Sequence, residues 1–277
     1  MAQVATTTLN IVGAGHVGRA LGRVFAARGV YAVQDVLTRS QAGARAAVDF
    51  IGAGAPVDAI GWMRPAAVWM LAVSDDRIAD VAAALARAHD LTGAVVFHCS
   101  GAKASSELAP LRDAGAAVAS VHPVRSFADP AAVASTFEDT WCGVEGDAAA
   151  LAQLVPSFEA AGARIVAIDA AAKTVYHAAA VFASNYLTTV LDAALRAYQA
   201  AGIPEAVARQ LAGPLVSETL ANVLRLGAPQ ALSGPIARGD EATVARQQAA
   251  VDAWDPASGR LYAALAEATR DLAGRKP

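Results

Sequence analysis

The chain has 277 residues, long for one domain and comfortable for two, and 55% of them are hydrophobic while only 17% are charged. This composition supports a large, helix-rich core, and the net charge of −3 gives no indication of binding to nucleic acid or a membrane surface. Two cysteines, Cys99 and Cys142, provide no disulfide framework, and no basic stretch followed by a long apolar one opens the sequence. We therefore expect a cytoplasmic protein without a secretory signal.

Residues 8–18 form a short apolar run that leads into a glycine-rich turn, and a helical pattern follows at once. Three glycines in this turn have the spacing G-x-G-x-x-G. In that motif the first glycine allows the tight turn, the second lets a pyrophosphate approach the backbone, and the third lets the helix pack on the strand. The context predicts a dinucleotide site, the alternative being an ordinary tight turn between strand and helix. The residues expected to bind are Gly13, Gly15, His16, Val17 and Gly18.

The next predicted strand, residues 31–40, indicates which dinucleotide binds. A site for NAD usually carries an acidic residue at the end of this strand, about 20 residues past the glycines. Here that place holds Thr38, Arg39 and Ser40, and a guanidinium with hydroxyls suits a 2′-phosphate better than a free diol. Asp35 is the only nearby acid and falls in the body of the strand. We therefore expect NADP(H); the alternative for Arg39 is a solvated loop arginine.

Strands and helices alternate over the first 168 residues. An apolar run at 66–73 is typical of a parallel strand buried on both faces, and the Ser-Asp-Asp at 74–76 signals a cap for a helix over 77–89. This alternation predicts an α/β fold with a Rossmann-type doubly wound parallel sheet. The further predicted elements are strands at 94–98, 116–121, 140–144 and 164–168 and a helix over 147–161, with Pro156 as a candidate bend.

Ligands of such sheets bind beyond the carboxyl ends of the strands, so the loops that follow the strands should converge on one crevice. These loops are residues 13–18, 38–40, 73–76, 99–103 and 122–127. We expect four of their residues to help bind the cofactor: Val73, Ser74, Asp75 and Ser100.

From residue 169 the pattern changes to helices alone, predicted over 171–200, 204–226, 241–253 and 256–273. Pro204 should lie in the first turn of its helix, and Asp240 should cap the last helical pair. The apolar stretch at 174–191 is amphipathic, so we do not expect it to cross a membrane. We expect residues 1–168 to form an NADP-binding domain and residues 169–277 a helical substrate and dimerisation domain, with the cleft between them.

Lys173, Tyr176 and His177 open the first of these helices and form the first candidate for chemistry. Lys173 and His177 are four residues apart and share a face. In an uninterrupted α-helix Ser184 lies about 20° round from Lys173, whereas Asn185 lies about 120° away. A lysine or histidine that faces a carbonyl can deliver the proton that accompanies hydride transfer. The alternative is a solvated lysine and a core histidine.

Four polar residues on the loops after strands form a second candidate: Ser100, Lys103, His122 and Arg125. A cation and hydroxyls there suit an anionic substrate or the nicotinamide ribose, the alternative being that they only cap the loops.

The polar loop at 232–240 holds Pro235, Arg238 and Asp240 and is the third candidate. Arg238 is suited to clamp a carboxylate bidentately, unless it pairs with Asp240 inside the loop.

A metal site is disfavoured by the pattern, although His98, Cys99, His122 and His177 include zinc-ligand types. Adjacent residues such as His98 and Cys99 point to opposite faces of a strand. No C-x-x-C or H-x-x-x-H pair supports them, so we expect no metal.

These residues support a resemblance that spans most of the chain. The chain resembles a bacterial family with an N-terminal Rossmann-like NADP domain and a C-terminal helical domain of unknown function, in the superfamily of 6-phosphogluconate dehydrogenase, ketopantoate reductase and pyrroline-5-carboxylate reductase. Some members are thought to act as alternative ketopantoate reductases. The matching stretches are Ile11–Gly18, His98–Ala102, Ser120–Pro123 with Phe127, Tyr176–Ala179 through Ser184–Tyr186, and Ser233–Asp240.

The resemblance implies NADP, a dimer with interlocked C-terminal helices, and a small carbonyl or imine substrate that bears a carboxylate. Many hydroxyacid dehydrogenases of that superfamily carry a lysine and, four residues later, an asparagine on this first C-terminal helix. Here Lys173 is followed by His177, and Asn185 comes two turns further on. If Lys173 is the general acid, as the resemblance implies, its partner has changed.

The leading hypothesis is an NADPH-dependent reductase similar to ketopantoate reductase. In it Lys173 or His177 supplies the proton, Ser100, Asn185 and Arg238 orient the substrate, and His122 and Ser184 help to bind it. The alternatives are a pyrroline-5-carboxylate reductase, a deazaflavin-linked oxidoreductase, and a sensor or scaffold that binds NADP(H) without chemistry.

Overall fold

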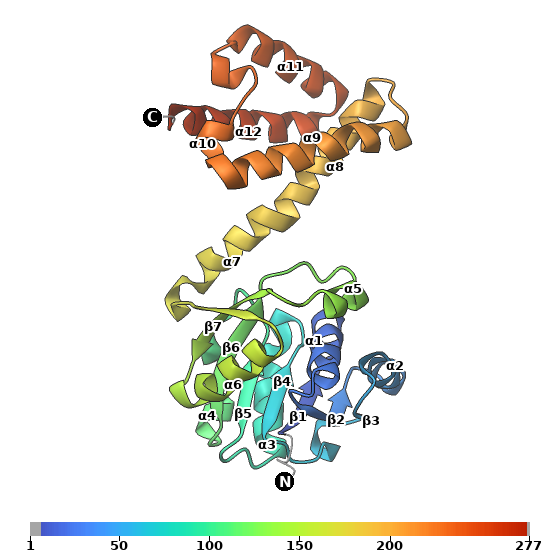
Figure 1. Cartoon of the computed structure of the whole chain (residues 1–277), viewed down its shortest axis with the longest axis vertical. Helices are drawn as coiled ribbons and strands as arrows, with labels where there is room; N and C mark the ends of the chain where they lie inside the picture. The colour runs from blue at the N-terminus through green and yellow to red at the C-terminus, as the bar shows by residue number, and fades with distance from the viewer. Residues whose placement is uncertain (1–6, 276–277) are drawn as a thin grey trace. The chain divides into compact units, whose positions relative to one another are not determined.

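The computed structural model describes residues 7–275 and divides the chain into two compact units, Met1–Ala183 and Ser184–Pro277 (Figure 1). Residues 1–6 lie outside the described residues. The expectation of no secretory signal rests partly on them. The sheet ends at Ala167, so the alternating pattern stops where the sequence predicts. The compact units divide later, because the next helix makes its polar contacts with the first unit. The functional boundary at 168/169 stays a prediction.

The first unit is built on an eight-stranded sheet with the order β3-β2-β1-β4-β5-β6-β7-β8. Neighbouring strands are parallel except β6 and β7, which are antiparallel. The doubly wound sheet is therefore confirmed, with one antiparallel step that the pattern did not predict. The strands are β1 (Thr8–Val12), β2 (Ala32–Leu37), β3 (Ala55–Val57), β4 (Val68–Leu71), β5 (Val95–His98), β6 (Ala117–Pro123), β7 (Trp141–Gly146) and β8 (Arg164–Ala167).

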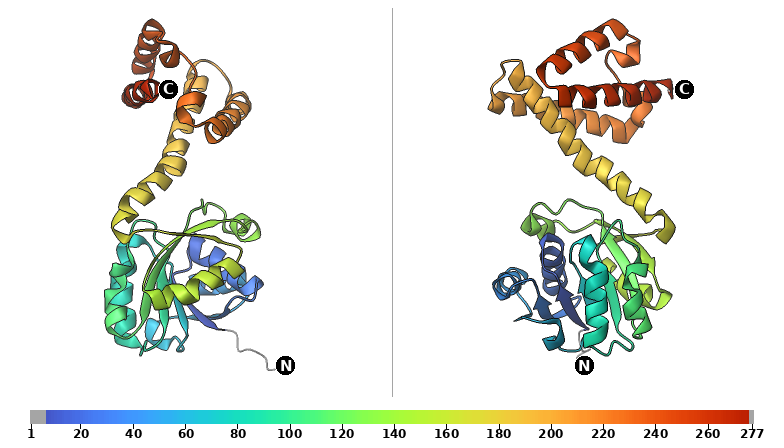
Figure 2. Two further views of the ribbon diagram at one scale, coloured as in Figure 1. Left: turned by 60° about the vertical axis from the view of Figure 1, so that its left-hand side comes forward. Right: turned by 180° about the vertical axis from the view of Figure 1, so that it is seen from behind.

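Helices cover both faces of this sheet, as the turned views of Figure 2 show. Along β4, Val68 and Met70 pack into one apolar cluster, while Trp69 and Leu71 pack into the other. The apolar run of this strand is thus buried on both faces, as predicted. One layer contains α1 (His16–Ala27), α2 (Gln41–Ile51), α5 (Pro130–Ser135) and α6 (Ala148–Ala160); the other contains α3 (Ile78–Ala88) and α4 (Ala109–Asp113).

The capping signal after β4 works differently from the prediction. Residues Asp75–Arg77 form a 3₁₀ turn and α3 begins only at Ile78. Ser74 occupies the N-cap position of that turn, but its side chain accepts no hydrogen bond from the turn's backbone. Further 3₁₀ turns lie at Ile60–Trp62, Ser105–Leu108, Ala170–Ala172 and Ile236–Arg238.

The predicted continuous helix over 171–200 is interrupted. It consists of the 3₁₀ turn Ala170–Ala172, α7 (Lys173–Val181), a π-helical segment at Phe182–Tyr186, and α8 (Leu187–Ala200). A π segment winds with more residues per turn than an α-helix. The α-helical register that placed Ser184 near the face of Lys173 therefore does not hold across this segment.

The second unit is all-helical. Within it α8 packs against α9, and α11 packs against α12. Asp240 caps α11 as predicted, since its Oδ1 accepts a hydrogen bond from the backbone N–H of Thr243 at 3.0 Å. The sequence predicts Pro204 in the first turn of its helix. In the structure Pro204 is instead the N-cap of α9, one residue before that turn. The remaining helices are α9 (Glu205–Leu226), α10 (Ala228–Ala231), α11 (Glu241–Trp254) and α12 (Pro256–Gly274).

The segment Ala170–Ala200 is long and apolar enough to cross a membrane by length and composition alone, with a mean hydropathy of 1.3 over its best window. A single helix of this kind is weak evidence for a membrane span, because the core helix of a soluble protein can have the same length and composition.

Candidate active site

The glycine loop after β1 has the geometry that its spacing predicts. Gly13 has a φ of +88°, which favours glycine, and a Cβ there would lie 2.7 Å from Ala72 and from Val73. A Cβ at Gly18 would collide with the carbonyl oxygen of Gly13, so helix and loop are in close contact. A Cβ at Gly15 would meet nothing within 4 Å. Two glycines therefore serve packing, while the third leaves space open beside the loop.

The open space at Gly15 lies at the N-terminus of α1. Gly15 is the N-cap, no side chain caps the helix, and its first turn carries no acidic residue. The first backbone N–H groups of α1 are thus left for an anion, and the helix dipole favours one there. Arg19 donates from Nε to the carbonyl of Ala14 at 2.9 Å and holds the loop. These features fit the pyrophosphate of a dinucleotide.

The carboxyl end of β2 offers a cation and no free acid. Arg39 is exposed and its side chain makes no hydrogen bond or ion pair within residues 7–275. Thr38 donates to the carbonyl of Ser40 at 2.7 Å, and the Ser40 hydroxyl caps α2 by accepting from Gly43 N–H at 3.1 Å. Asp35 lies inside β2, as predicted, and is 1% exposed.

The carboxylate of Asp35 is already occupied. It accepts hydrogen bonds from the backbone N–H of Arg64 at 2.6 Å and from the Arg64 guanidinium at 2.5 Å. The carboxylate is therefore satisfied within the protein, and this pair explains why an acid can sit in the second strand without serving a ribose.

Residues of the loop after β4 lie near those of the other loops. The Val73 side chain is next to Gly13. Ser74 and Asp75 are exposed. The charge of Asp75 raises the pKa of both His122 and Lys173, although other effects on these two groups are larger. The loop after β4 is thus close to the glycine loop and within electrostatic reach of the residues around β6, as the convergence of strand ends predicts.

Lys173 lies at the start of α7 with its ammonium inside the first unit. The residue is 1% exposed, and its Nζ donates to the Ser100 carbonyl at 3.1 Å and to the Ser120 hydroxyl at 2.5 Å. A carboxylate oxygen of Glu145 lies 3.8 Å from Nζ. Burial lowers the pKa of Lys173, and the charge of Glu145 opposes that effect. The alternative of a solvated lysine is therefore wrong.

Glu145 is itself held from two sides. Its two oxygens accept hydrogen bonds from the N–H and the hydroxyl of Ser105, each at 2.7 Å. The buried ion pair thus connects α7 to β7 and to the loop after β5. Glu145 lies inside a strand without a motif, and Ser120 belongs to a stretch of the resemblance, but the sequence does not show that either residue contacts Lys173.

His122, Tyr176 and His177 form a second group around the end of β6. The Tyr176 hydroxyl and Nδ1 of His122 are 3.0 Å apart, and the rings of His122 and His177 meet edge to face at 5.6 Å between centroids. A Cβ on Gly101 would lie 2.8 Å from Nε2 of His122 and would collide with Nδ1 of His177. Gly101 is thus required for both imidazoles to approach the loop after β5.

The electrostatics around His122 and Tyr176 favour the neutral form of both side chains. Burial, followed by the charges of His177 and Lys173, lowers the pKa of His122 to about 4. Burial raises the pKa of Tyr176 to about 12. His122 is therefore neutral near pH 7, and the Tyr176 phenol keeps its proton. Two titratable groups with opposite shifts in contact are typical of a functional site.

The other loop residues of the second candidate serve local structure. Lys103 forms an ion pair with Glu107 at 3.2 Å. The Arg125 guanidinium donates to Thr136 and to the Thr140 hydroxyl. The Ser100 hydroxyl accepts from the N–H groups of Ala102 and Lys103 at 3.2 and 2.9 Å. Capping is thus their observed role, and of these four side chains only His122 joins the polar group at the end of β6.

His98 and the cysteines do not gather into a metal site. Nε2 of His98 contacts the Ala104 carbonyl at 3.1 Å, and its Nδ1 accepts from the Ser100 N–H at 3.2 Å. Burial raises the pKa of Cys99 and raises that of Cys142 to about 12, so neither thiol readily becomes a thiolate. Among the described residues, no three His, Cys, Asp or Glu side chains cluster as metal ligands would.

Three predicted substrate residues belong to the second unit. Ser184 and Asn185 lie in the π-helical segment, where their carbonyls accept hydrogen bonds from Thr188 and Thr189. Arg238 is exposed and makes no ion pair with Asp240 in the part of the chain that the structure describes. Internal pairing of Arg238 is therefore not observed, and contact of these residues with a substrate stays a prediction.

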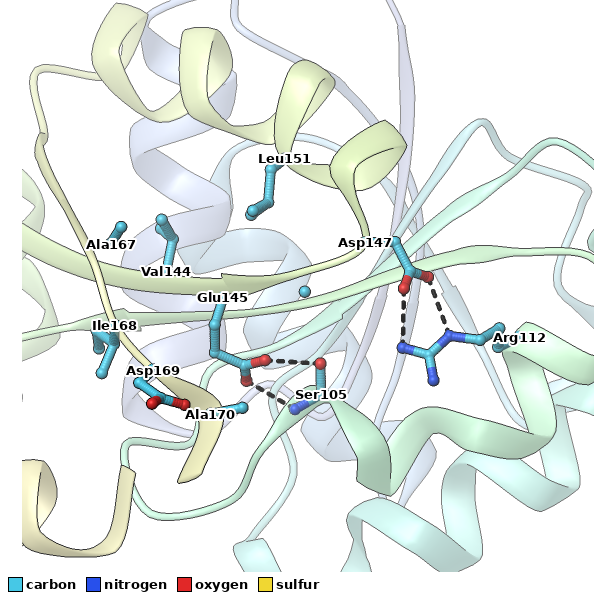
Figure 3. Close-up of a pocket in the computed structure, with 11 residues that line it drawn as sticks. Ser105, Arg112, Val144, Glu145, Asp147, Leu151, Ala167, Ile168, Asp169 and Ala170 are labelled. Atoms are coloured by element: carbon cyan, nitrogen blue, oxygen red, sulfur yellow. Dashed lines mark hydrogen bonds and ion pairs between the residues drawn. The ribbon is translucent and has the colours of Figure 1, made fainter. Parts of the chain in front are cut away.

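A separate pocket of about 460 Å³ lies in the first unit (Figure 3). Glu145 and Ser105 contact each other on one side of it, and Arg112 and Asp147 pair on another. Because β7 runs antiparallel to β6, the pocket lies beside the amino end of β6. Glu145 in its lining is also the ion-pair partner of Lys173, so the pocket adjoins the buried contacts at the start of α7. Its polar side chains are already paired with one another, apart from Asp169, which caps the turn before α7.

Comparisons with known protein families match the N-terminal and C-terminal parts of the chain separately. Residues 2–123 match the model of a Rossmann-like domain, and residues 140–269 match that of a domain of unknown function, DUF2520. The two matches agree with the N-terminal Rossmann-like domain and the C-terminal helical domain of the family that the sequence resembles. No curated protein matches the chain.

Solved structures share the fold. BF3122 from Bacteroides fragilis, provisionally described as an NADP oxidoreductase, matches with a TM-score of 0.81 at 19% identity, covering 97% of this chain and 100% of that one. Protein TM1727 from Thermotoga maritima matches with a TM-score of 0.73 at 27% identity, covering 96% and 98%. An imine reductase from Myxococcus stipitatus in complex with NADP⁺ matches with a TM-score of 0.66 at 17% identity, covering 96% and 92%. A pyrroline-5-carboxylate reductase from Coxiella burnetii shares the fold as well, with a TM-score of 0.61 at 15% identity, covering 97% and 98%.

Proposed function

We propose that the protein is an NADPH-dependent reductase of a small carbonyl or imine compound that bears a carboxylate, with ketopantoate as the favoured substrate. One observation carries the proposal: an uncapped, glycine-lined helix N-terminus and the group of His122, Tyr176 and His177 lie at the carboxyl ends of parallel strands of one sheet. Ligands of such sheets bind at that edge. The fold of an imine reductase in complex with NADP⁺ supports the same function.

The residues present fit a bound dinucleotide phosphate. Gly13, Gly15 and the first N–H groups of α1, from His16 to Gly18, would hold the pyrophosphate. Arg39, with Thr38 and Ser40 beside it, would hold the 2′-phosphate, and residues 73–75 would line the site together with Ser100. When bound, the reduced dinucleotide supplies a hydride, the step for which this protein has no group of its own.

The side chains of the protein would bind the substrate and handle a proton. His122 and His177 stand beside Gly101 at the strand ends and are of a type suited to proton transfer near neutral pH. Lys173, which the resemblance marks as the acid, is 1% exposed and engaged by three oxygens, so it acts through the residues it holds. Ser184, Asn185 and Arg238 would orient the substrate, with Arg238 on its carboxylate.

We also propose that a second copy of the chain covers the helical unit in the cytoplasm. Val207, Leu211 and Leu215 follow each other at four-residue intervals along one face of α9, and they are 43%, 48% and 57% exposed. An apolar stripe of this kind is typical of a helix that packs against another helix. Ultracentrifugation should show a dimer, and Leu211→Glu should shift the mass toward the monomer.

Calorimetric titration of the protein with NADPH and NADH tests the cofactor. We expect tighter binding of NADPH, and Arg39→Ala should weaken NADPH binding by about tenfold or more, since a charge-assisted hydrogen bond is lost. Arg45→Ala, at an exposed arginine on α2 shortly after Arg39, is the matched control. If neither nucleotide binds, the glycine loop is an ordinary turn and the proposal fails.

Turnover is tested by NADPH oxidation with ketopantoate, pyrroline-5-carboxylate and other short 2-oxo and 3-oxo acids. A rate with ketopantoate supports the favoured substrate, and a rate with the cyclic imine alone supports the pyrroline-5-carboxylate alternative. Binding of NADPH without turnover of any of these compounds would favour a sensor, or a partner such as a deazaflavin as the hydride acceptor.

A further inference from the structure

We propose that His122 gives the proton to the oxygen or nitrogen of the substrate, and that Tyr176 holds the His122 ring in the tautomer that can do so. The proposal deepens the reductase function given above and rests on it. It also moves the proton from Lys173 and His177, which the sequence favours, to a residue that the sequence marks only for substrate binding.

The contact between Tyr176 and His122 fixes the tautomer. The phenol has one proton to donate, and the Nδ1 atom of His122 at 3.0 Å is the acceptor it meets within residues 7–275. If Nδ1 donated instead, the phenolic proton would have no partner among these residues. The proposal therefore assigns the acceptor role to Nδ1, which places the ring's own proton on Nε2.

The position of Tyr176 depends on a glycine in β7. A Cβ on Gly143 would lie 2.5 Å from the Tyr176 hydroxyl oxygen and 2.9 Å from Cζ. The phenol thus packs directly onto the strand next to β6, and any side chain at position 143 would displace it. This packing holds the hydroxyl beside His122 without a water molecule between them.

Nε2 of His122 is suited to meet a substrate. It makes no hydrogen bond within the described part of the chain, yet it is not among the fully buried unpartnered atoms, so it keeps contact with solvent. Nδ1 of His177, in contrast, is fully buried and unpartnered. Among residues 7–275, His177 therefore meets no hydrogen-bonding group at Nδ1 that would fix its tautomer or replace a proton it gives away.

The charges around His122 keep the ring neutral. From α7 it faces Tyr176, His177 and the Lys173 ammonium, and from the loop after β4 it faces Asp75. Burial and the two cationic or titratable neighbours on α7 disfavour the imidazolium, and Asp75 only partly offsets them. A neutral ring that donates from Nε2 needs a source for the next proton, and Tyr176 is in contact with it.

The atoms balance as follows. Reduction of the C=O or C=N carbon by hydride from the reduced nicotinamide leaves an electron pair on the oxygen or nitrogen. That pair takes the Nε2 proton, so an O–H or N–H bond forms and the Nε2–H bond breaks, while Nδ1 takes the phenolic proton of Tyr176. Water then returns a proton to Nε2, and the Nδ1 proton goes back to the phenolate. The net reaction consumes one hydride and one solvent proton.

The tautomer is tested directly by long-range ¹H–¹⁵N NMR of protein labelled at histidine, free and with NADPH, between pH 5.5 and pH 8. His122→Gln identifies the resonances of His122. We expect a neutral ring protonated on Nε2, and we expect Tyr176→Phe to produce a mixture of tautomers. Tyr262→Phe, which removes an exposed phenol bonded to Gln247, is the matched control and should change nothing. A ring protonated on Nδ1, or a tautomer unaffected by Tyr176→Phe, would overturn the proposal.

Turnover gives the second test, with ketopantoate and pyrroline-5-carboxylate as the substrates. His122→Gln should lower kcat by about 100-fold or more, and Tyr176→Phe by about tenfold, with NADPH affinity within about twofold of the parent protein. His89→Gln, at a ring that contacts the Ile60 carbonyl away from these residues, is the matched control.

The two levels of the proposal fail in different ways. Full turnover by His122→Gln would overturn the proton-donor role while leaving the reductase intact. A parent protein that binds NADPH but reduces neither substrate would overturn the reductase function and the proton-donor role with it.

Discussion

Two buried acid–base pairs in the first unit differ in how far each cation reaches water. The side chains of Asp35 and Arg64 are 2% and 59% exposed, with 2.5 Å between their closest atoms. The side chains of Glu145 and Lys173 are 6% and 2% exposed, with 3.8 Å between their closest atoms. The first pair is a buried carboxylate with a solvated cation, whereas the second places both charges inside the protein.

The difference shows what each pair does. Burying two charges costs desolvation that their attraction does not always repay, so a fully buried pair is weak evidence for stability. The desolvation cost of Lys173 is partly offset by hydrogen bonds, since its ammonium also binds Ser100 and Ser120. These bonds join α7 to the loop after β5. The pair at Asp35 instead neutralises an acid in the dinucleotide strand. One pair thus positions the residues around His122, and the other leaves Arg39 as the charge at its strand end.

Lys173→Met should have the largest effect on stability. The variant keeps the apolar stem but leaves the Glu145 carboxylate buried without its cation, a change that costs about 3–5 kcal/mol. Urea denaturation at pH 7 measures the loss.

The double variant Lys173→Met with Glu145→Gln is the control for this prediction. It removes both charges, so it should be more stable than the single variant. A single variant within about 1 kcal/mol of the parent protein would mean that Glu145 takes up a proton or reaches water, and that the pair does not hold α7.

Asp35→Asn should have a smaller effect, because Arg64 is already solvated. The amide oxygen can still accept the Arg64 N–H, so we expect a loss of about 2 kcal/mol, the value of a hydrogen bond to a charged group. Calorimetric titration with NADPH should show unchanged affinity, since the carboxylate faces Arg64. A gain in NADH affinity or a loss of NADPH affinity would contradict the separation between Asp35 and the cofactor site.

The Rossmann-like part of the fold can be predicted from the sequence because its local geometry requires particular residue types. Gly13 and Gly18 are required by contacts that any Cβ would break, and the apolar run of β4 reflects burial on both faces. The doubly wound sheet is also predicted from the sequence, whereas the antiparallel step between β6 and β7 is not. Nothing in the spacing marks that step, because the link between these strands contains only the short α5.

The contacts around His122 are not visible in the sequence, because tertiary packing decides them. Lys173 and His177 share a helical face in the sequence, yet Lys173 is buried among oxygens while His177 meets His122. Tyr176 lies between them in sequence and becomes the partner of His122 only because Gly143 leaves room for its ring. A single glycine in a strand carries no signal of that kind, so the sequence names these residues but does not show the contacts between them.

Acidification should lower the free energy of unfolding through His122, and this is the smallest of the effects predicted here. The folded-state pKa of about 4 lies below the ordinary value of 6.5, so between these values the unfolded chain binds a proton that the folded protein does not. Stability contributed by the neutral ring is thus complete above pH 6.5 and is lost as the pH falls toward 4, by about 1 kcal/mol at pH 5.5. His98, whose pKa is also lowered by burial, adds a loss in the same direction.

Urea midpoints at pH 7.5 and pH 5.5 should therefore differ less in His122→Gln than in the parent protein, whereas His89→Gln should keep the parent's difference. An equal difference in all three proteins would mean that His122 titrates as a solvated histidine, and that the contact with Tyr176 does not hold it neutral.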